Sequence, residues 1–210
     1  MDDSKNIETS IYKEAEYKET KPEKQKMING EMYFSGADYL VKEREECKDF
    51  CYDYNALRPS KTSEQNALIK KIFGKVGTNC FITAPFWCDY GYNISVGDNF
   101  YANHNLVILD CAKVTIGNNV FIAPDCGIYT AGHPIDAATR NSGYEYAYPI
   151  TIGNDVWIGG GVKILPGVTV GNNVVIGAGS IVTKDIPDNS VAVGNPCKVI
   201  KKIENWVKLR

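Results

Sequence analysis

Hydrophobic residues recur at every sixth position over the second half of the chain. An α-helix face repeats every 3.6 residues and a half-buried strand every two, so neither element explains a period of six. The pattern instead predicts short strands joined by turns, each turn of the chain placing one aliphatic side chain inward. The aligned positions are Val96, Ala102 and Ile108; Ile116, Ile122 and Ile128; and Ile152, Ile158, Ile164, Val170, Ile176 and Val182.

Glycine followed by asparagine or aspartate separates many of these positions. Such residues tolerate the positive φ angles that tight corners require. Three hexapeptides with corners of this kind close a triangular coil, and successive coils stack about 4.8 Å apart as parallel strands. We therefore expect a mainly β protein with a parallel β-helix over residues 76–186. The corner sequences are Gly97-Asp98-Asn99, Gly117-Asn118-Asn119, Gly153-Asn154-Asp155 and Gly171-Asn172-Asn173.

A helical pattern precedes the repeat, over residues 22–75. Ser35 and Asp38 resemble a capping box, and apolar residues then follow at helical spacing as far as Tyr54. A further helix is expected over residues 63–73. These helices alone would make a thin core, so we expect them to pack on the β-helix.

The two ends of the chain differ from both patterns. Residues 1–21 carry six acidic and four basic residues with scattered apolar ones, which predicts a disordered or frayed tail. Residues 187–210 are expected to form a C-terminal segment that includes a short helix.

One loop, residues 129–149, interrupts the six-residue period between Ile128 and Ile150. A β-helix folds without such an excursion, so a loop of this length points to function. It contains His133, one of only two histidines in the chain. Histidine titrates near neutral pH and is the usual general base of enzymes. The other histidine, His104, lies beside Asn103 and is interpreted as a packing or rim residue.

Composition excludes several classes of function. The net charge is −2 and the pI about 5.8, so the chain has no overall basic field for nucleic acid or anionic lipid. No apolar stretch approaches the roughly 18 residues of a spanning helix. The acidic start of the chain lacks the layout of a signal peptide, which favours a cytoplasmic protein.

The seven cysteines are odd in number and include no CxxC pair. Cys47 and Cys51, four residues apart in a predicted helix, offer half of a metal site, but no second pair and no paired histidine completes it in the sequence. We therefore expect reduced thiols packed as small hydrophobic groups, and no metal.

Several segments resemble known proteins. Residues 150–180, ITIGNDVWIGGGVKILPGVTVGNNVVIGAGS, resemble the left-handed parallel β-helix acyltransferases, and the handedness is implied by that resemblance alone. The likeness to maltose and galactoside O-acetyltransferases is narrower and covers about residues 24–203. It rests on KMINGEMYFSG (26–36), DYGYNISVGDNFYANHN (89–105), TAGHPIDAATRNSG (130–143) and VTKDIPDNSVAVGNPCKVIKKI (182–203).

This resemblance implies an acetyl-CoA-dependent transfer of acetyl to a sugar hydroxyl, in a homotrimer with active sites between subunits. Such a transfer needs a base, a donor for the tetrahedral oxyanion and a groove for the cofactor. His133 is expected to be the base, and Asn103 is implied to stabilise the transition state. Gly160 is implied to present its backbone N–H to the thioester.

The resemblance also assigns binding residues. Ser35 stands where galactoside-type relatives carry aspartate, which makes the maltose-type branch the nearer one. The implied acceptor contacts are Ser35, Arg44, Asp89 and Asn103. The implied cofactor contacts are Asn103, Gly160, Trp157, Ala178, Thr183 and Lys184, with Lys198 and Lys201 near the 3′-phosphate.

From the residues alone, plainer interpretations stay open. Asn103 suits a turn and Gly160 a coil corner, while Trp157 suits a core. The lysines of the sequence KVIKKI suit the solvated face of a helix.

Three other classes of function stay open at this stage. One is a hexapeptide-repeat acetyltransferase acting on an antibiotic hydroxyl. Another is a γ-type carbonic anhydrase, but its site needs three histidine ligands and the chain has two histidines. The last is a non-catalytic β-helix scaffold, which would leave the loop at 129–149 without a purpose.

Overall fold

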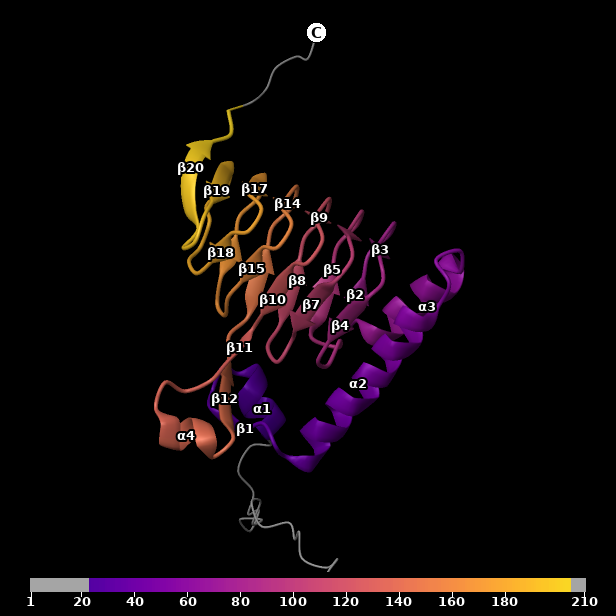
Figure 1. Ribbon diagram of the computed structural model, residues 1–210, viewed down its shortest axis with the longest axis vertical. Coiled ribbons are helices and arrows are strands. Elements are labelled where there is room, and N and C mark those ends of the chain that lie inside the picture. The colour runs from indigo at the N-terminus through magenta and orange to yellow at the C-terminus, as the bar shows by residue number, and fades with distance from the viewer. Residues whose placement is uncertain (1–22, 205–210) are drawn as a thin grey trace, which may run out of the picture.

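The computed structural model describes residues 23–204 (Figure 1). The predicted tail at 1–21 and residues 205–210 lie outside this part. The chain forms a stack of coils whose strands line up in three parallel sheets, with helices at one end of the stack and a hairpin at the other. The predicted parallel β-helix is confirmed.

Each complete coil contributes one strand to each of the three sheets, and the second sheet has two further strands at its end. The first sheet contains β2 (Lys75–Val76), β5 (Ile94–Val96), β8 (Val114–Ile116), β13 (Ile150–Ile152) and β16 (Thr169–Val170). The second contains β3 (Phe81–Ile82), β6 (Tyr101–Ala102), β9 (Phe121–Ile122), β14 (Trp157–Ile158), β17 (Val174–Ile176), β19 (Ser190–Val193) and β20 (Lys198–Lys202). The third contains β4 (Phe86–Cys88), β7 (Leu106–Leu109), β10 (Gly127–Tyr129), β15 (Lys163–Ile164) and β18 (Ile181–Val182).

The register of the sheets explains the six-residue period. Ile116 pairs with Ile152, and Ile122 pairs with Ile158 in the next sheet. Their side chains are at most 2% exposed, so each hexapeptide adds one aliphatic group to a continuous inner column. This column supplies the hydrophobic core that short strands could not make singly.

The glycine-led corners differ in detail from the prediction. The positive φ is adopted by the third residue, as at Asn119 (φ 56°) and Asp155 (φ 58°). The glycines are required by close stacking instead, since a Cβ at Gly117 would lie 2.7 Å from the carbonyl oxygen of Gly153. The Asn119 side-chain amide donates to the Asp155 carboxylate at 2.8 Å, so corner side chains form a ladder along the stack.

The helices are α1 (Glu23–Ile28), α2 (Asp38–Ala56), α3 (Thr62–Ile72) and α4 (Ala137–Asn141). The segment α2 packs on β4 and α3 on β2, so both cover the first coil. The predicted capping box is wrong: no side chain caps α2, and the Ser35 hydroxyl donates instead to the carbonyl of Gly143 at 3.2 Å. Tertiary contact with the loop at 129–149 replaces the local cap.

The helix expected in the C-terminal segment is not formed over residues 187–204. Lys198–Lys202 are the strand β20, which turns back and pairs antiparallel with β19. The last parallel strand would otherwise present unpaired backbone groups, and β20 pairs with that edge. Within the described range, no helix is both long and apolar enough to cross a bilayer.

Candidate active site

Extra residues interrupt the hexapeptide period at one corner of the stack. The inner positions Cys88 and Val96 are eight residues apart, as are Ile108 and Ile116, where six would continue the repeat. The loop at 129–149 enlarges the same corner of the next coil, because it also joins the third sheet to the first. Side chains from three successive coils therefore meet there.

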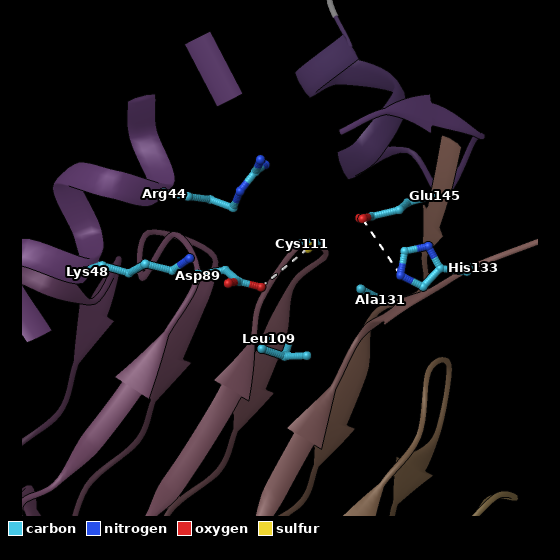
Figure 2. Close-up of a pocket in the computed structure, with 8 residues that line it drawn as sticks. All are labelled: Arg44, Lys48, Asp89, Leu109, Cys111, Ala131, His133 and Glu145. Atoms are coloured by element: carbon cyan, nitrogen blue, oxygen red, sulfur yellow. Dashed lines mark hydrogen bonds and ion pairs between the residues drawn. The ribbon is translucent and has the colours of Figure 1, made fainter. Parts of the chain in front are cut away.

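A cavity of about 310 Å³ lies at this enlarged corner (Figure 2). It contains three of the residues expected from the sequence: Arg44, Asp89 and His133. The sequence prediction missed the other residues that line it. These are Lys48, Leu109, Cys111, Ala131 and Glu145. The eight-residue spacings could have pointed to Leu109 and Cys111, and Lys48 lies one helical turn beyond Arg44.

His133 is held by a small antiparallel sheet. The excursion loop contributes β11 (Ala131–Gly132) and β12 (Tyr144–Ala147), and the N-terminal segment adds β1 (Tyr33–Phe34). His133 directly follows β11, and its Nε2 lies 3.9 Å from Oε1 of Glu145 on β12. That distance is an ion-pair distance when the imidazole is protonated, and it is too long for a hydrogen bond. Figure 2 shows the ring facing the cavity.

Glu145 is itself fixed by a buried tyrosine. The Tyr33 hydroxyl donates to Oε2 of Glu145 at 2.7 Å. Burial, followed by the neighbouring Cys111 and Glu145, raises the pKa of Tyr33 well above its usual value, so the hydroxyl stays a neutral donor. The carboxylate is thus oriented toward His133, where it can stabilise an imidazolium.

The opposite wall carries cations beside a carboxylate. Arg44 donates to the Tyr90 hydroxyl at 2.6 Å and to the Ser35 carbonyl at 2.8 Å. Burial raises the pKa of Asp89, while Lys48 and Arg44 oppose that shift. Ser35, expected to contact the acceptor, lies behind Arg44 and does not line the cavity. The wall therefore offers both donors and acceptors, and its two cations are balanced by Asp89 together with Glu145 on the other side of the cavity.

A fully buried carboxyl, Asp110, supports this wall. One oxygen accepts the backbone N–H groups of Asp89 at 3.1 Å and Tyr90 at 2.9 Å. The other has no hydrogen-bond partner among the described residues. Burial raises the pKa of Asp110 to about 7, and the two N–H donors only partly oppose this. Both the protonated acid and the carboxylate are therefore populated near neutral pH.

Asp110 should make stability depend on pH. Its carboxyl titrates near pH 4 when unfolded and near pH 7 when folded, so its stabilisation is complete below pH about 4 and is lost as the pH rises through about 7. We expect urea unfolding to show a larger loss between pH 5 and 8 in the wild type than in Asp110→Asn, which keeps the acceptor oxygen. Equal losses would contradict this assignment.

Asn103 and Gly160 lie at a different corner of the coil. Asn103 follows β6 and precedes β7, so it joins the second sheet to the third. Gly160 and Ala178 occupy the same corner two and three coils further on, linked by a bond from the Gly179 N–H to the Gly160 carbonyl at 2.8 Å. Within one chain, Asn103 is thus not brought to the cavity that His133 lines.

The remaining predicted residues are exposed. Thr183 and Lys184 follow β18, at the corner that joins the third sheet to the first, and Lys198 and Lys201 lie on β20. Trp157 is 56% exposed, so its side chain is not in the core. His104 is also exposed, and its Nδ1 contacts the Ala84 carbonyl at 2.5 Å, as expected for local packing.

Comparisons with known proteins agree with this architecture. The family model "Maltose acetyltransferase hexapeptide capping motif" matches residues 26–77, and "Bacterial transferase hexapeptide (six repeats)" matches 149–184. Galactoside O-acetyltransferase of Escherichia coli (strain K12) is 47% identical over 184 residues, covering 88% of this chain and 91% of that protein.

Solved structures give the same result. A maltose O-acetyltransferase from Clostridium difficile 630 has a TM-score of 0.86 and 54% identity, covering 87% of this chain and 98% of that one. A galactoside acetyltransferase in complex with coenzyme A has a TM-score of 0.86 and 45% identity, covering 90% and 98%. These similarities span both the helical segment and the β-helix.

Proposed function

Since the chain belongs to the family of maltose and galactoside O-acetyltransferases, which share the hexapeptide repeat, we propose that it transfers acetyl from acetyl-CoA to a sugar hydroxyl. One observation carries this proposal: His133 faces a polar cavity and is backed by Glu145. A solved relative that binds coenzyme A supports the choice of donor.

The cavity fits an uncharged polyhydroxyl acceptor. Its volume of about 310 Å³ is at the lower end of small-molecule sites, which suits a mono- or disaccharide. Asp89 can accept bonds from sugar hydroxyls, while Arg44 and Lys48 can donate to sugar oxygens. An acceptor with a net charge would leave one of these groups unpaired. We propose a primary hydroxyl, the 6-OH, as the one acetylated.

The chemistry follows from the position of His133. Its imidazole takes the proton of the sugar hydroxyl as the oxygen attacks the thioester carbonyl, and Glu145 stabilises the imidazolium that results. The tetrahedral intermediate then collapses, the imidazolium returns the proton, and coenzyme A leaves as the thiol. The thioester is already activated, so no acetyl-enzyme is needed.

Kinetics with a panel of acceptors tests this proposal. We expect acetyl-CoA with glucose, maltose and galactosides to give mono-acetylated sugars by mass spectrometry, with intersecting initial-rate lines. An antibiotic acceptor used in preference to every sugar would favour the rival acetyltransferase class. Parallel lines, or an acetylated peptide trapped without sugar, would overturn the direct transfer.

We propose that the active protein is a homotrimer with its sites between subunits. An aromatic ladder (Phe81, Tyr101, Phe121 and Trp157) runs in register along the outer face of the second sheet. Phe121 is 49% exposed, and a stripe of this kind marks an interaction surface. The ladder borders the corner that carries Asn103 and Gly160. A neighbouring copy would therefore place that corner against the cavity that His133 lines.

The cofactor is proposed to pass along the corner that carries Gly160 and Ala178. Among residues 23–204, nothing requires glycine at position 160, because a Cβ there would meet only the Pro124 carbonyl, at 3.4 Å. Its neighbour Gly159 is different: a Cβ there would lie 2.6 Å from the Ala178 nitrogen. The open side of Gly160 suits close approach of a ligand.

Two alanine substitutions separate these roles. Gly160→Ala is expected to change the unfolding free energy by less than about 0.5 kcal/mol but to lower kcat/KM for acetyl-CoA by about 10- to 100-fold. Gly159→Ala, the matched control, is expected to destabilise the fold by about 2–3 kcal/mol. Urea unfolding and steady-state kinetics check both. An unchanged kcat/KM in Gly160→Ala would contradict the proposal that the cofactor passes along this corner.

A further inference from the structure

Three cysteine thiols form a buried cluster beneath the helices. Cys47 and Cys51 lie on successive turns of α2, and Cys88 ends β4 in the first coil. The Cys88 sulfur is 3.5 Å from that of Cys47 and 3.8 Å from that of Cys51. None of the three residues is more than 4% exposed. The sequence offered no second pair and no paired histidine for Cys47 and Cys51, and the third thiol is that of a single residue, Cys88, 37 positions beyond Cys51.

The spacing of the sulfurs matches a three-coordinate thiolate site. A metal–sulfur bond of about 2.3 Å in a planar trigonal arrangement places the sulfurs about 4.0 Å apart. All three ligand atoms lie within 4.8 Å of one another, and two of the separations are 3.5 and 3.8 Å. Side-chain adjustments of a few tenths of an ångström would complete the triangle.

The donor set selects the metal. No fourth cysteine, histidine or carboxylate joins the group among residues 23–204. Structural zinc is almost always four-coordinate, whereas three soft thiolates in an apolar setting suit Cu(I). The cluster is also enclosed, so a water molecule has no open path to a fourth position.

The cluster lies beside a second cavity, which adjoins the one that His133 lines. A second cavity, of about 290 Å³, is lined by Cys88 and Lys48 among others and shares Lys48, Asp89 and Leu109 with the first.

We propose that Cys47, Cys51 and Cys88 bind one Cu(I) ion in trigonal thiolate coordination. The ion enters as Cu(I) and stays in that oxidation state, and the thiols that become ligands release their protons to solvent. Bound metal would join α2 to β4. Lys48 lies on α2 and Asp89 directly follows β4, and both line the cavity at His133. The site itself does not depend on the proposed acetyltransferase activity.

Anaerobic titration with Cu(I) against the chelator bicinchoninate tests the proposal on the full chain. We expect one ion per chain, with X-ray absorption showing three sulfur neighbours at about 2.3 Å. Cys51→Ala should weaken binding at least about 100-fold. The control, Cys80→Ala combined with Cys197→Ala, removes the two half-buried thiols and should bind as the wild type does.

Several results would overturn this assignment. One is an equal loss of binding in the control, and another is nitrogen or oxygen neighbours around the copper. Zn(II), offered alone, would overturn the choice of metal if these thiols held it in four-coordinate form. If Cys51→Ala does not fold, as judged by circular dichroism, the X-ray absorption spectrum of the wild-type complex tests the proposal alone. Three sulfur neighbours would support it, and nitrogen or oxygen neighbours would overturn it.

Discussion

Replacement of His133 by alanine is expected to lower kcat by about 10²–10⁴, the usual range for removal of a general base. The protein should remain folded, because the His133 side chain is 59% exposed and its ion pair with Glu145 is partly solvated. Urea unfolding and steady-state kinetics with acetyl-CoA and the best sugar of the panel measure both quantities.

His104→Ala is the matched control for this prediction. His104 is also exposed but lies at the other corner, with its ring against the Ala84 carbonyl. We expect its kcat to stay within about threefold of the wild type. Near-normal turnover in a folded His133→Ala variant, or equal losses in the two variants, would rule out His133 as the base.

Mixing two inactive variants is expected to restore activity. In the proposed trimer, each site takes His133 from one subunit and Asn103 from its neighbour. Random assembly of His133→Ala with Asn103→Ala leaves both residues intact at about one quarter of the sites. Co-refolded mixtures should therefore recover about one quarter of the wild-type rate, a gain of tens- to thousands-fold over either parent.

The oligomeric state provides the check on this result. Sedimentation should give a mass three times 23.2 kDa for both variants and for the mixture. Unmixed variants taken through the same refolding are the controls. Trimers that regain no activity on mixing would show that each chain uses its own residues, and a well-folded active monomer would contradict the shared site.

The β-helix could be predicted because its determinants are local and periodic. Every sixth residue, such as Ile116, Ile122 and Ile128, faces the same inner column, and the register of the strands follows from that spacing. The loop at 129–149 was predicted for the same reason, as a break in the period. His133 then followed, because the break contains it.

Other features depend on contacts that no local pattern encodes. Glu145 and Lys48 reach the cavity only because β12 pairs back on β11 and α2 packs on the first coil. Lys198–Lys202 have a sequence that suits either a helix or a strand, and the open edge of β19 decides. Likewise, the Cys88 thiol is an inner-column residue in sequence, and only the packing of α2 turns it into a cluster member.

Both ends of the stack are covered, which limits the growth of the assembly. A column of parallel strands has two open edges, and each could accept a strand from another molecule and extend into a fibre. Here α2 and α3 cover the first coil, while β20 runs antiparallel across the last strand (Figure 1). An antiparallel strand breaks the direction that a further coil would need. The protein therefore has the continuous strand pairing of a fibre core, but the stack of coils cannot grow by adding strands from other molecules.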